Sequence, residues 1–449
     1  MDTLQELTNL DVAFIWPFCG TGTRELALTI KSCIIGFGFP FADLFAWELS
    51  RTSMTLIDPK DVIRDKPIDA LCETADHYFR VITDRTHLLS KPFSSLMEGP
   101  QMIYKLGLLL EGLQLSKGMR VLDFASGSCW LSRILNQFGC STISVDASAR
   151  ALEIGRELFA LQPIIGVSID APAFIHFDGK KLRIPDESVD RVICFDGFHH
   201  VPNQKQVLAE LSRVLKQGGV AGFSEPGRHH SRSPQSQYEM RNYDVLENDI
   251  IIEDILQLAI ESGFTGAYLK PLIDPNLSLT PGEYCRILET GMLPDCIRVS
   301  STNAMSGATV FFLSKGELRR DSRSYVGLQH KITLSGTEFH VPHSFHFALE
   351  VEVVNAGSAR WLADAPNDIG TVKIGFHLYT GSGQLITLDF HRWKIARDVN
   401  PGESILARID VPTPNESGEY LLAVDLVSEG VCWFQNVGSE LVMVSLAVE

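Results

Sequence analysis

The sequence lacks the cysteine pattern of a disulfide framework or a zinc ribbon. Its 449 residues include nine cysteines, an odd number, and none of them forms a C-x-x-C pair. Scattered thiols of this kind are typical of a cytoplasm, where structural disulfides are rare. We therefore expect reduced cysteines and a cytoplasmic protein.

A long apolar run is also missing. The most apolar early stretch covers residues 32–41 and is soon followed by Asp43, whereas a membrane-spanning helix needs about 20 apolar residues. The start, Met1 to Glu6, has neither the basic nor the apolar part of a signal peptide. We expect no membrane span.

Basic residues are scarce relative to acidic ones. There are 39 Lys and Arg against 55 Asp and Glu, a net charge of −16 at pH 7. A protein with a large negative net charge repels phosphate backbones, so we expect no nucleic-acid partner. Hydrophobic residues make up 45% and charged residues 21%, which excludes a disordered chain. The length allows two or three domains.

Three zones differ in pattern. Residues 1–90 predict a helical segment, with one helix over 69–82, that packs on or covers the second zone. Residues 91–320 alternate short β-branched runs with amphipathic helices, which predicts an α/β fold with a mostly parallel sheet. Residues 325–449 show short alternating strands between turns, which predicts an all-β, immunoglobulin-like sandwich.

The expected elements have definite positions. In the central zone we expect helices at 149–161 and 204–215 and strands at 118–124, 141–146, 174–177, 191–195, 220–223, 267–270 and 308–313. In the tail we expect strands at 344–354, 372–380, 405–411, 420–427 and 440–448. Between 271 and 305, a segment with several prolines is expected to lie over the cleft and help select the acceptor.

Chemistry-bearing residues follow the ends of the predicted parallel strands, where such sheets bind ligands. Asp123 ends the first strand, and the small-residue turn 125–127 lets a ligand approach the backbone. The amides of Cys129 and Trp130 then open a helix, which suits an anion. Asp146 ends the second strand and could accept both hydroxyls of a ribose.

Two further strand ends complete this edge. Asp178 ends the third strand, where its carboxylate could accept from an adenine amine, and Phe195 and Asp196 close the fourth. A nicotinamide-binding Rossmann domain would place similar residues here, but the G-x-G-x-x-G turn that it needs is absent.

Six segments in this order resemble the class I S-adenosylmethionine-dependent methyltransferases, over roughly residues 90–320. They are VLDFASG at 121–127, VDAS at 145–148, IPDESVDRV at 184–192, CFD with HHV at 194–201, VLKQGG at 214–219 and SEPG at 224–227. The resemblance implies a seven-stranded Rossmann-like sheet with an antiparallel final strand, and S-adenosylmethionine as the cofactor.

The resemblance also implies the cofactor contacts. These are Asp123, Ala125, Ser126, Gly127, Cys129, Trp130, Asp146, Ala147, Asp178, Gly179, Phe195 and Asp196. The family usually has three glycines in the first turn, and here Ala125 and Cys129 replace two of them. Ala125 is small enough for the turn if its backbone dihedral angles are ordinary.

A hydroxyl acceptor needs a base for its proton. The candidates are His199, Glu225 and His230, of which Glu225 and His230 are close enough in sequence to pair. The alternatives are structural, with His199 ordering a loop and Glu225 capping a helix. Metal-dependent action stays open, but no tight cluster of His, Asp and Glu demands it, so no metal ligands are predicted.

Half of the six tryptophans lie in the tail, at Trp361, Trp393 and Trp433. They could stack on sugars, but composition favours core or interface positions. Segments 400–403, 417–422 and 426–434 resemble sandwich modules of bacterial surface-polysaccharide proteins, which implies a sugar-linked setting. The sandwich could also join copies of the chain into a homo-oligomer.

These features together predict a cytoplasmic methyltransferase of bacterial type. The expected acceptor is a small molecule or glycan: a hydroxyl of a sugar, nucleotide-sugar or lipid-linked glycan in surface-polysaccharide biosynthesis. One alternative is a small aromatic or quinone-like metabolite as the acceptor. Another is a glycan-binding adaptor without catalytic activity.

Overall fold

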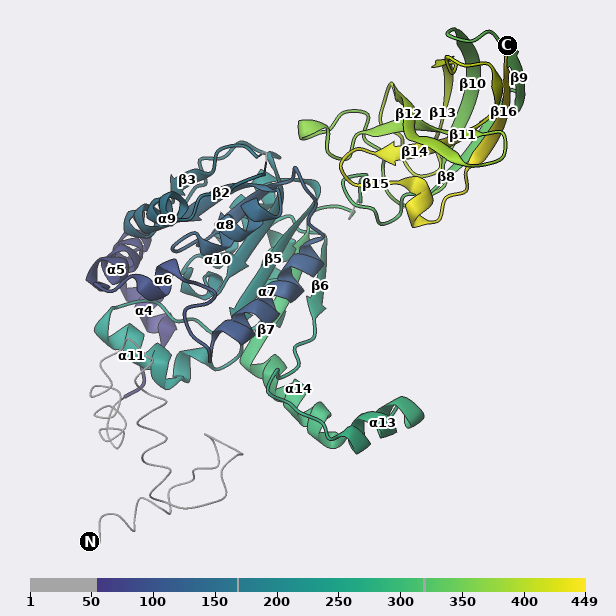
Figure 1. Cartoon of the computed structure of the whole chain (residues 1–449). Helices are drawn as coiled ribbons and strands as arrows, with labels where there is room; N and C mark the ends of the chain where they lie inside the picture. The colour runs from purple at the N-terminus through teal and green to yellow at the C-terminus, as the bar shows by residue number, and fades with distance from the viewer. Residues whose placement is uncertain (1–54, 168, 318–319) are drawn as a thin grey trace. The chain divides into compact units, whose positions relative to one another are not determined.

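The computed structural model describes residues 55–449 apart from 168, 318 and 319 (Figure 1). Most of the expected N-terminal helical segment, residues 1–54, therefore lies outside the described residues. The part that is described contains helices α4 (Pro59–Asp65), α5 (Ile68–Val81) and α6 (Thr86–Leu89). Helix α5 confirms the helix expected over 69–82. The proposed domain boundaries remain predictions.

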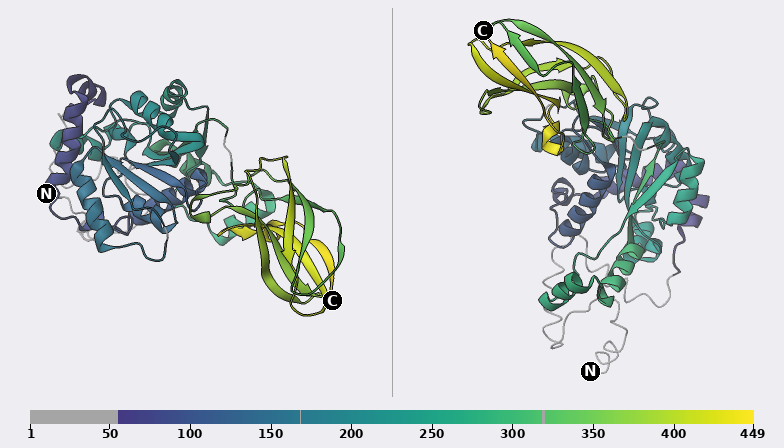
Figure 2. Two further views of the ribbon diagram at one scale, coloured as in Figure 1. Left: turned by 90° about the horizontal axis from the view of Figure 1, so that it is seen from above. Right: turned by 90° about the vertical axis from the view of Figure 1, so that its right-hand side faces the viewer.

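A seven-stranded sheet forms the centre of the first part of the described chain (Figures 1 and 2). Strands β1 to β5 are parallel, and β7 runs antiparallel to both β5 and β6, as the methyltransferase resemblance implies. The strand order is β3 (Ala173–His176), β2 (Ser141–Asp146), β1 (Arg120–Phe124), β4 (Val189–Phe195), β5 (Leu215–Pro226), β7 (Ala308–Ser314) and β6 (Gly266–Lys270).

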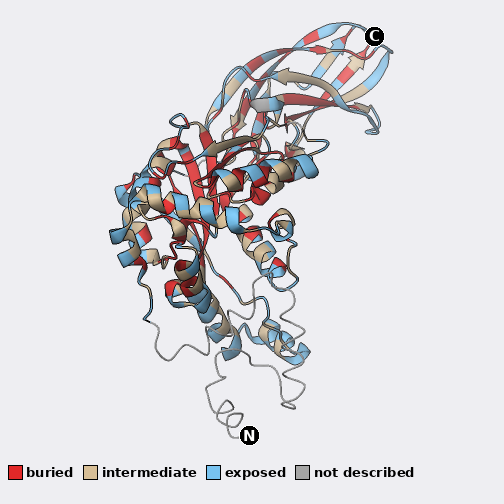
Figure 3. Ribbon diagram, turned by 90° about the vertical axis from the view of Figure 1, so that its left-hand side faces the viewer, coloured by how far each residue is buried: buried red, intermediate tan, exposed pale blue. Residues whose placement is uncertain are grey.

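Helices cover both faces of this sheet because successive strand residues point to opposite sides. Val121 packs with α7 (Gly99–Leu113) and α8 (Trp130–Gln137), whereas the next residue, Leu122, packs with α10 (Gln204–Val214) and α12 (Ile252–Glu261). On β7, Phe311 likewise packs on the same side of the sheet as Leu122, and Phe312 packs on the same side as Val121. The inner strands β1, β2, β4, β5 and β7 are accordingly almost wholly buried, whereas the edge strands β3 and β6 are more exposed (Figure 3). Helix α9 (Ala149–Leu161) follows β2 at the residues predicted for it.

The strand order reverses between β1 and β4. From β1 the chain continues outward to β2 and β3, then returns to place β4 on the other side of β1. The connections that follow β1 and β4 therefore lead to opposite sides of the sheet order, and ligands of parallel sheets bind at such a point.

The connection between β6 and β7 is helical. It holds α13 (Pro281–Thr290), which begins with a Thr280–Glu283 capping box, and α14 (Asp295–Gly307). Neither helix contains a buried residue, and α13 lies away from the sheet (Figures 1 and 2). The prediction that this segment covers the cleft is therefore not supported for α13.

The tail is all β, as predicted. Its strands form a three-stranded sheet and a six-stranded sheet, antiparallel except for the pairing of β16 with β9. The first sheet has β8 (His330–Leu334), β10 (His346–Asn355) and β13 (Ser404–Pro412); the second has β9 (Glu338–Val341), β11 (Val372–Thr380), β12 (Leu385–Lys394), β14 (Gly418–Ser428), β15 (Cys432–Trp433) and β16 (Val442–Val448). Short turns η4 (Pro366–Asp368) and η5 (Phe434–Val437) complete it.

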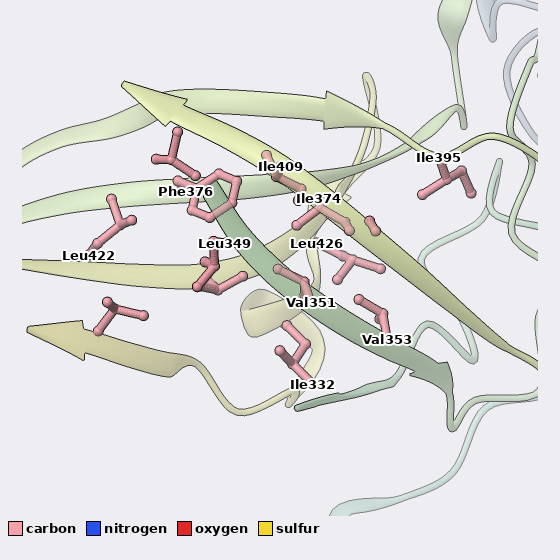
Figure 4. Close-up of a cluster of buried hydrophobic side chains, with 14 of the residues drawn as sticks. Ile332, Leu349, Val351, Val353, Ile374, Phe376, Ile395, Ile409, Leu422 and Leu426 are labelled. Atoms are coloured by element: carbon pink, nitrogen blue, oxygen red, sulfur yellow. The ribbon is translucent and has the colours of Figure 1, made fainter. Parts of the chain in front are cut away.

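The two sheets share one core, which makes the tail a sandwich. Burial alternates along β10, and its inward residues Leu349 and Val351 face Ile374 and Phe376 of β11 (Figure 4). Trp361 is completely buried in this core, Trp393 packs against it, and Trp433 lies 4.3 Å from the ring of His377. Trp361 is thus a core residue, as composition favours, whereas Trp393 and Trp433 are only partly buried. Within the described residues, no helix has the length and apolar character needed to cross a membrane.

Candidate active site

The turn after β1 has an unusual backbone. Ala125, Gly127 and Cys129 have φ values of 55°, 52° and 57°. The two non-glycine residues adopt a left-handed conformation that costs about 1–2 kcal/mol each, so the condition of ordinary dihedral angles at Ala125 is not met. A side chain on Gly197, in the loop after β4, would lie 2.6 Å from Ala125 Cβ. The two loops therefore touch at the switch point.

Asp146 links this turn to the next helix. Its Oδ2 accepts the Gly127 N–H at 2.8 Å, and its Oδ1 accepts the Ser148 N–H at 2.8 Å. Burial raises the pKa of this carboxyl, and the two amides oppose that shift. The carboxylate predicted to hold a ribose is thus fixed in orientation at the end of β2.

Helix α5 lies over the same edge. Asp76 Oδ1 accepts hydrogen bonds at 2.9 Å from the Ser148 Oγ and from the Arg150 N–H, which fastens α5 to the start of α9. Among the described residues, only the tip of Phe79 would come within 4 Å of a side chain on Gly127, at 3.8 Å. The backbone of the turn is therefore open to a ligand beneath Phe79. An open glycine turn beside a fixed carboxylate fits the nucleoside part of S-adenosylmethionine.

Three predicted cofactor residues instead use their side chains for packing. Asp123 is buried, and its Oδ2 accepts the Ser132 N–H and O–H at 3.0 and 2.7 Å, which ties α8 to β1. Burial raises the pKa of Asp123 to about 7. Ser126 and Cys129 are buried against each other, with Oγ and Sγ 3.6 Å apart. Burial also raises the pKa of the Cys129 thiol to about 12. These side chains therefore stabilise the turn, and only backbone groups remain for a ligand.

Two aromatic residues and one carbonyl frame the turn. Trp130 is nearly buried and packs edge-on against Phe195, with ring centroids 5.4 Å apart. The Ala147 carbonyl lies 2.9 Å from His176 Nε2. All three residues lie at the carboxyl edge, and their contacts with the cofactor remain predictions.

The third strand end is more exposed. Asp178 Oδ1 accepts the amides of Lys180 and Lys181 at 2.9 Å, and the Lys181 amide, the largest contribution, lowers the pKa of Asp178. Gly179 has a φ of 77°, and a side chain there would collide with Ile68 and Cys72 of α5.

Asp196 lies beyond β4 with a φ of 48° and a half-exposed side chain. Lys105 of α7 lies 3.8 Å from its carboxylate. Asp196 thus lies at the carboxyl end of β4, and its contact with the cofactor remains a prediction.

Glu225 holds the loop after β4. It is completely buried, and its Oε1 accepts the Gly197 and Phe198 N–H groups at 3.1 and 2.9 Å. Its Oε2 accepts the His199 N–H at 3.2 Å and lies 2.8 Å from His199 Nδ1. Burial would raise the pKa of Glu225, but the His199 contact and the amides outweigh it and lower the pKa. Glu225 is therefore an ionised positioning group for η2 (Phe198–His200) rather than an exposed base.

His199 is itself buried, and burial is the largest cause of its lowered pKa. A neutral ring has one protonated nitrogen, and a carboxylate accepts that proton's hydrogen bond. His199 Nδ1 is therefore the donor to Glu225, and Nε2 carries the lone pair. That nitrogen lies 3.9 Å from Glu247 Oε2.

His230 is paired with Glu247, at 2.7 Å between Nε2 and Oε2, and not with Glu225 as the sequence suggested. Each histidine thus has its own buried carboxylate. Burial opposes ionisation of Glu247, but His200, His230 and His199 outweigh it and lower the pKa of Glu247 to about 2. The sequence reasoning missed Glu247 because it lies between α11 (Pro234–Asn242) and α12 in a stretch without a motif.

Further ionisable groups surround this cluster. His200 Nδ1 lies 2.7 Å from the Leu246 carbonyl and its ring lies 3.9 Å from that of His199. Burial and the nearby Glu247 raise the pKa of Glu239, on α11, to about 7. Burial also raises the pKa of the Tyr78 hydroxyl on α5. His200, Glu239 and Tyr78 thus add further ionisable side chains around the cluster.

Comparison with known proteins identifies the domain. Residues 122–223 match the model of a methyltransferase domain family. The chain is 35% identical over 112 residues to demethylmenaquinone methyltransferase of Clavibacter sepedonicus, which covers 24% of this chain and 43% of that protein. It is 31% identical over 144 residues to the enzyme of the same name from Renibacterium salmoninarum, covering 31% and 56%.

A third relative is the methyltransferase GfsG of Streptomyces halstedii, 30% identical over 121 residues, or 26% of this chain and 41% of the relative. The chain thus spans about half the length of these curated relatives. Among solved structures, phosphoethanolamine N-methyltransferase 2 of Haemonchus contortus has 17% identity and a TM-score of 0.39, covering 56% of this chain and 60% of that one. The match of residues 122–223 to a methyltransferase domain agrees with the predicted methyltransferase domain.

Proposed function

We propose that this chain is an S-adenosylmethionine-dependent methyltransferase that takes the proton of a small acceptor at the His230–Glu247 pair. The observation that carries this proposal is the meeting of two features at one sheet edge. The open Gly127 turn with its fixed Asp146 lies after β1 and β2, and the histidine–carboxylate cluster lies after β4 and β5.

The first feature would hold the cofactor. Gly127 offers backbone without a side chain, Asp146 offers carboxylate oxygens for a ribose, and Phe79 covers the turn from α5. When bound, S-adenosylmethionine supplies a methyl group on a sulfonium, already activated for displacement. The protein's remaining task is to orient the acceptor and exclude water.

The second feature would remove the proton. Glu247 stays ionised and accepts from His230 Nε2, which leaves the lone pair on Nδ1 of His230. The His230 side chain is 24% exposed, whereas that of His199 is 6% exposed. His230 is therefore the better candidate for contact with an acceptor, and base catalysis of this kind contributes about 10²- to 10⁴-fold. His199 and Glu225 position the loop beside it.

The acceptor that the relatives favour is a hydroxylated aromatic or quinone-like compound, because two of them are named demethylmenaquinone methyltransferases. A sugar, nucleotide-sugar or glycan acceptor is the second candidate, and it rests on the likeness of the tail to polysaccharide-linked sandwiches. A cytoplasmic location and a homo-oligomer joined through the sandwich remain predictions.

A panel of acceptors with methyl-labelled S-adenosylmethionine tests this proposal. Phenols, hydroxylated naphthoquinones and nucleotide-sugars are incubated with the full chain, and labelled products are identified by mass spectrometry. We expect label in the aromatic or quinone fraction, lost in His230→Gln and kept in His229→Asn. Label in the nucleotide-sugars alone would favour the second candidate, and no binding of S-adenosylhomocysteine at millimolar concentration would contradict both.

A further inference from the structure

We propose that His199, His230 and Glu247 form a binding site for one divalent transition-metal ion, with Zn²⁺ as the best match. One possible ligand atom from each residue lies within 4.8 Å of the other two, although the residues come from three separate segments of the chain. Two histidines and one carboxylate are a ligand set that Zn²⁺ uses when a fourth position stays open.

The distances are close to those of a tetrahedral ion. Bonds of about 2.0–2.2 Å to Zn²⁺ place neighbouring ligand atoms about 3.3 Å apart. Glu247 Oε2 lies 2.7 Å from His230 Nε2 and 3.9 Å from His199 Nε2, so the observed separations bracket that value. The third separation, between the ligand nitrogens of the two histidines, is within 4.8 Å.

An outer carboxylate already orients one ligand. Glu225 accepts from His199 Nδ1 at 2.8 Å and is itself fixed by the amides of Gly197 and Phe198. This pairing directs the lone pair of Nε2 toward Glu247, as in the carboxylate–histidine–metal arrangements that support metal sites. The orientation of His199 is thus built into the fold before any ion binds.

Glu247 provides a second, independent sign of a missing partner. Its side chain is only 4% exposed, and no N–H or O–H donor is hydrogen-bonded to its Oε1 among the described residues, although His200 Nδ1 lies 3.4 Å away and the Glu239 carboxyl is close enough to interact with Glu247. The two carboxylates of Glu225 and Glu247 are therefore buried beside the imidazole rings of three histidines: His199, His200 and His230. Buried charge is costly unless it is paired or bound to metal, and a dication among these groups would compensate both.

Ion binding by itself does not depend on the proposed function. If both are correct, the ion and the Glu247–His230 hydrogen bond compete for the same Nε2 atom. Ion-loaded protein would then bind an acceptor oxygen at the open fourth position, whereas ion-free protein would use the His230 lone pair. His230 is 24% exposed and leaves a path for that oxygen.

The test uses the tag-free full chain, dialysed against a chelator and titrated with ZnCl₂ in a calorimeter. We expect one ion per chain, with affinity lowered at least 100-fold in Glu247→Gln and in His230→Gln. Glu225→Gln removes no ligand but should weaken binding about 10- to 100-fold, because it releases His199. The matched controls are Glu253→Gln and His229→Asn, both at exposed positions, which should bind the ion as the wild type does.

Two further readouts keep the proposal open to refutation. Co²⁺ should give the intense visible absorption of a tetrahedral site in the wild type and not in His230→Gln. S-adenosylhomocysteine binding reports whether each variant is folded. The metal site is refuted if the wild type binds no stoichiometric ion. It is also refuted if folded Glu247→Gln and His230→Gln bind Zn²⁺ as tightly as the wild type. In either case, intact binding of S-adenosylhomocysteine would leave the proposed function standing.

Discussion

His199 Nδ1 lies 2.8 Å from Glu225 Oε2, and both side chains are buried where the loop after β4 meets the end of β5. The same carboxylate accepts three backbone N–H groups of that loop. One residue of β5 therefore fixes both the path of the neighbouring loop and the ring orientation of its histidine.

Replacement of Glu225 tests this positioning role. In Glu225→Gln, one acceptor oxygen becomes an NH₂ group that cannot accept from His199. We expect the free energy of unfolding to fall by about 1–3 kcal/mol, the cost of leaving buried donors unpaired. Chemical denaturation measures the change. Glu253→Gln, at an exposed position paired with Arg228, should lose little stability because water screens the pair, and equal losses in both variants would refute the role.

The His230 base has a kinetic signature. His230→Gln should lower turnover by about 10²-fold or more and leave the affinity for S-adenosylhomocysteine within a factor of two or three, because the cofactor turn does not contact His230. Turnover with the best acceptor of the panel and calorimetry measure the two effects. The neighbouring His229→Asn keeps a residue that tolerates the left-handed φ of 72° and should behave as the wild type. Full activity in His230→Gln would remove this base.

The turn after β1 carries strain that a glycine would relieve. Ala125→Gly should raise the free energy of unfolding by about 0.5–1 kcal/mol, because a φ of 55° disfavours alanine by more than the added chain entropy of glycine costs. Ala209→Gly, in the exposed part of α10, should instead lose about 1 kcal/mol. Thermal and urea unfolding of both variants measure these opposite signs, and a loss in Ala125→Gly would contradict the strain.

Asp123 predicts a pH dependence of stability. Its pKa is raised from 3.8 to about 7 in the folded protein, mainly by burial, so the folded state holds a proton that the unfolded state releases. The stability from this proton is complete below about pH 4 and is lost as the pH rises through 7. Between pH 5 and 8 the wild type should lose on the order of 2–3 kcal/mol more than Asp123→Asn. Urea unfolding at both pH values measures the difference, and parallel losses would refute the raised pKa.

The regular elements were predictable because they depend on local pattern. Helix α9 and strands β2 and β11 begin and end where periodicity placed them, and Asp146 follows from its position at a strand end. Strand β12 was missed because both of its faces are largely exposed, so no apolar alternation marks it.

The pairing of side chains was not predictable in the same way. Glu225 and His230 are five residues apart, yet the fold gives each a different partner, since Glu225 points into the loop after β4 and His230 turns toward Glu247. Asp123 has the sequence position of a ligand contact, but its Oδ2 accepts hydrogen bonds from the N–H and the O–H of Ser132 on the following helix. Such partners depend on how separate segments meet, and no local pattern records that.

The most direct test of the central claim is calorimetric titration of the full chain with S-adenosylhomocysteine, in the wild type and in Asp146→Asn. We expect one site per chain, with affinity about 10- to 100-fold lower in the variant, because charged hydrogen bonds to a ribose are each worth about 1.5–3 kcal/mol. Asp254→Asn, an exposed carboxylate on α12, should bind as the wild type does. No binding by the wild type at millimolar ligand, or equal affinity in Asp146→Asn, would contradict it.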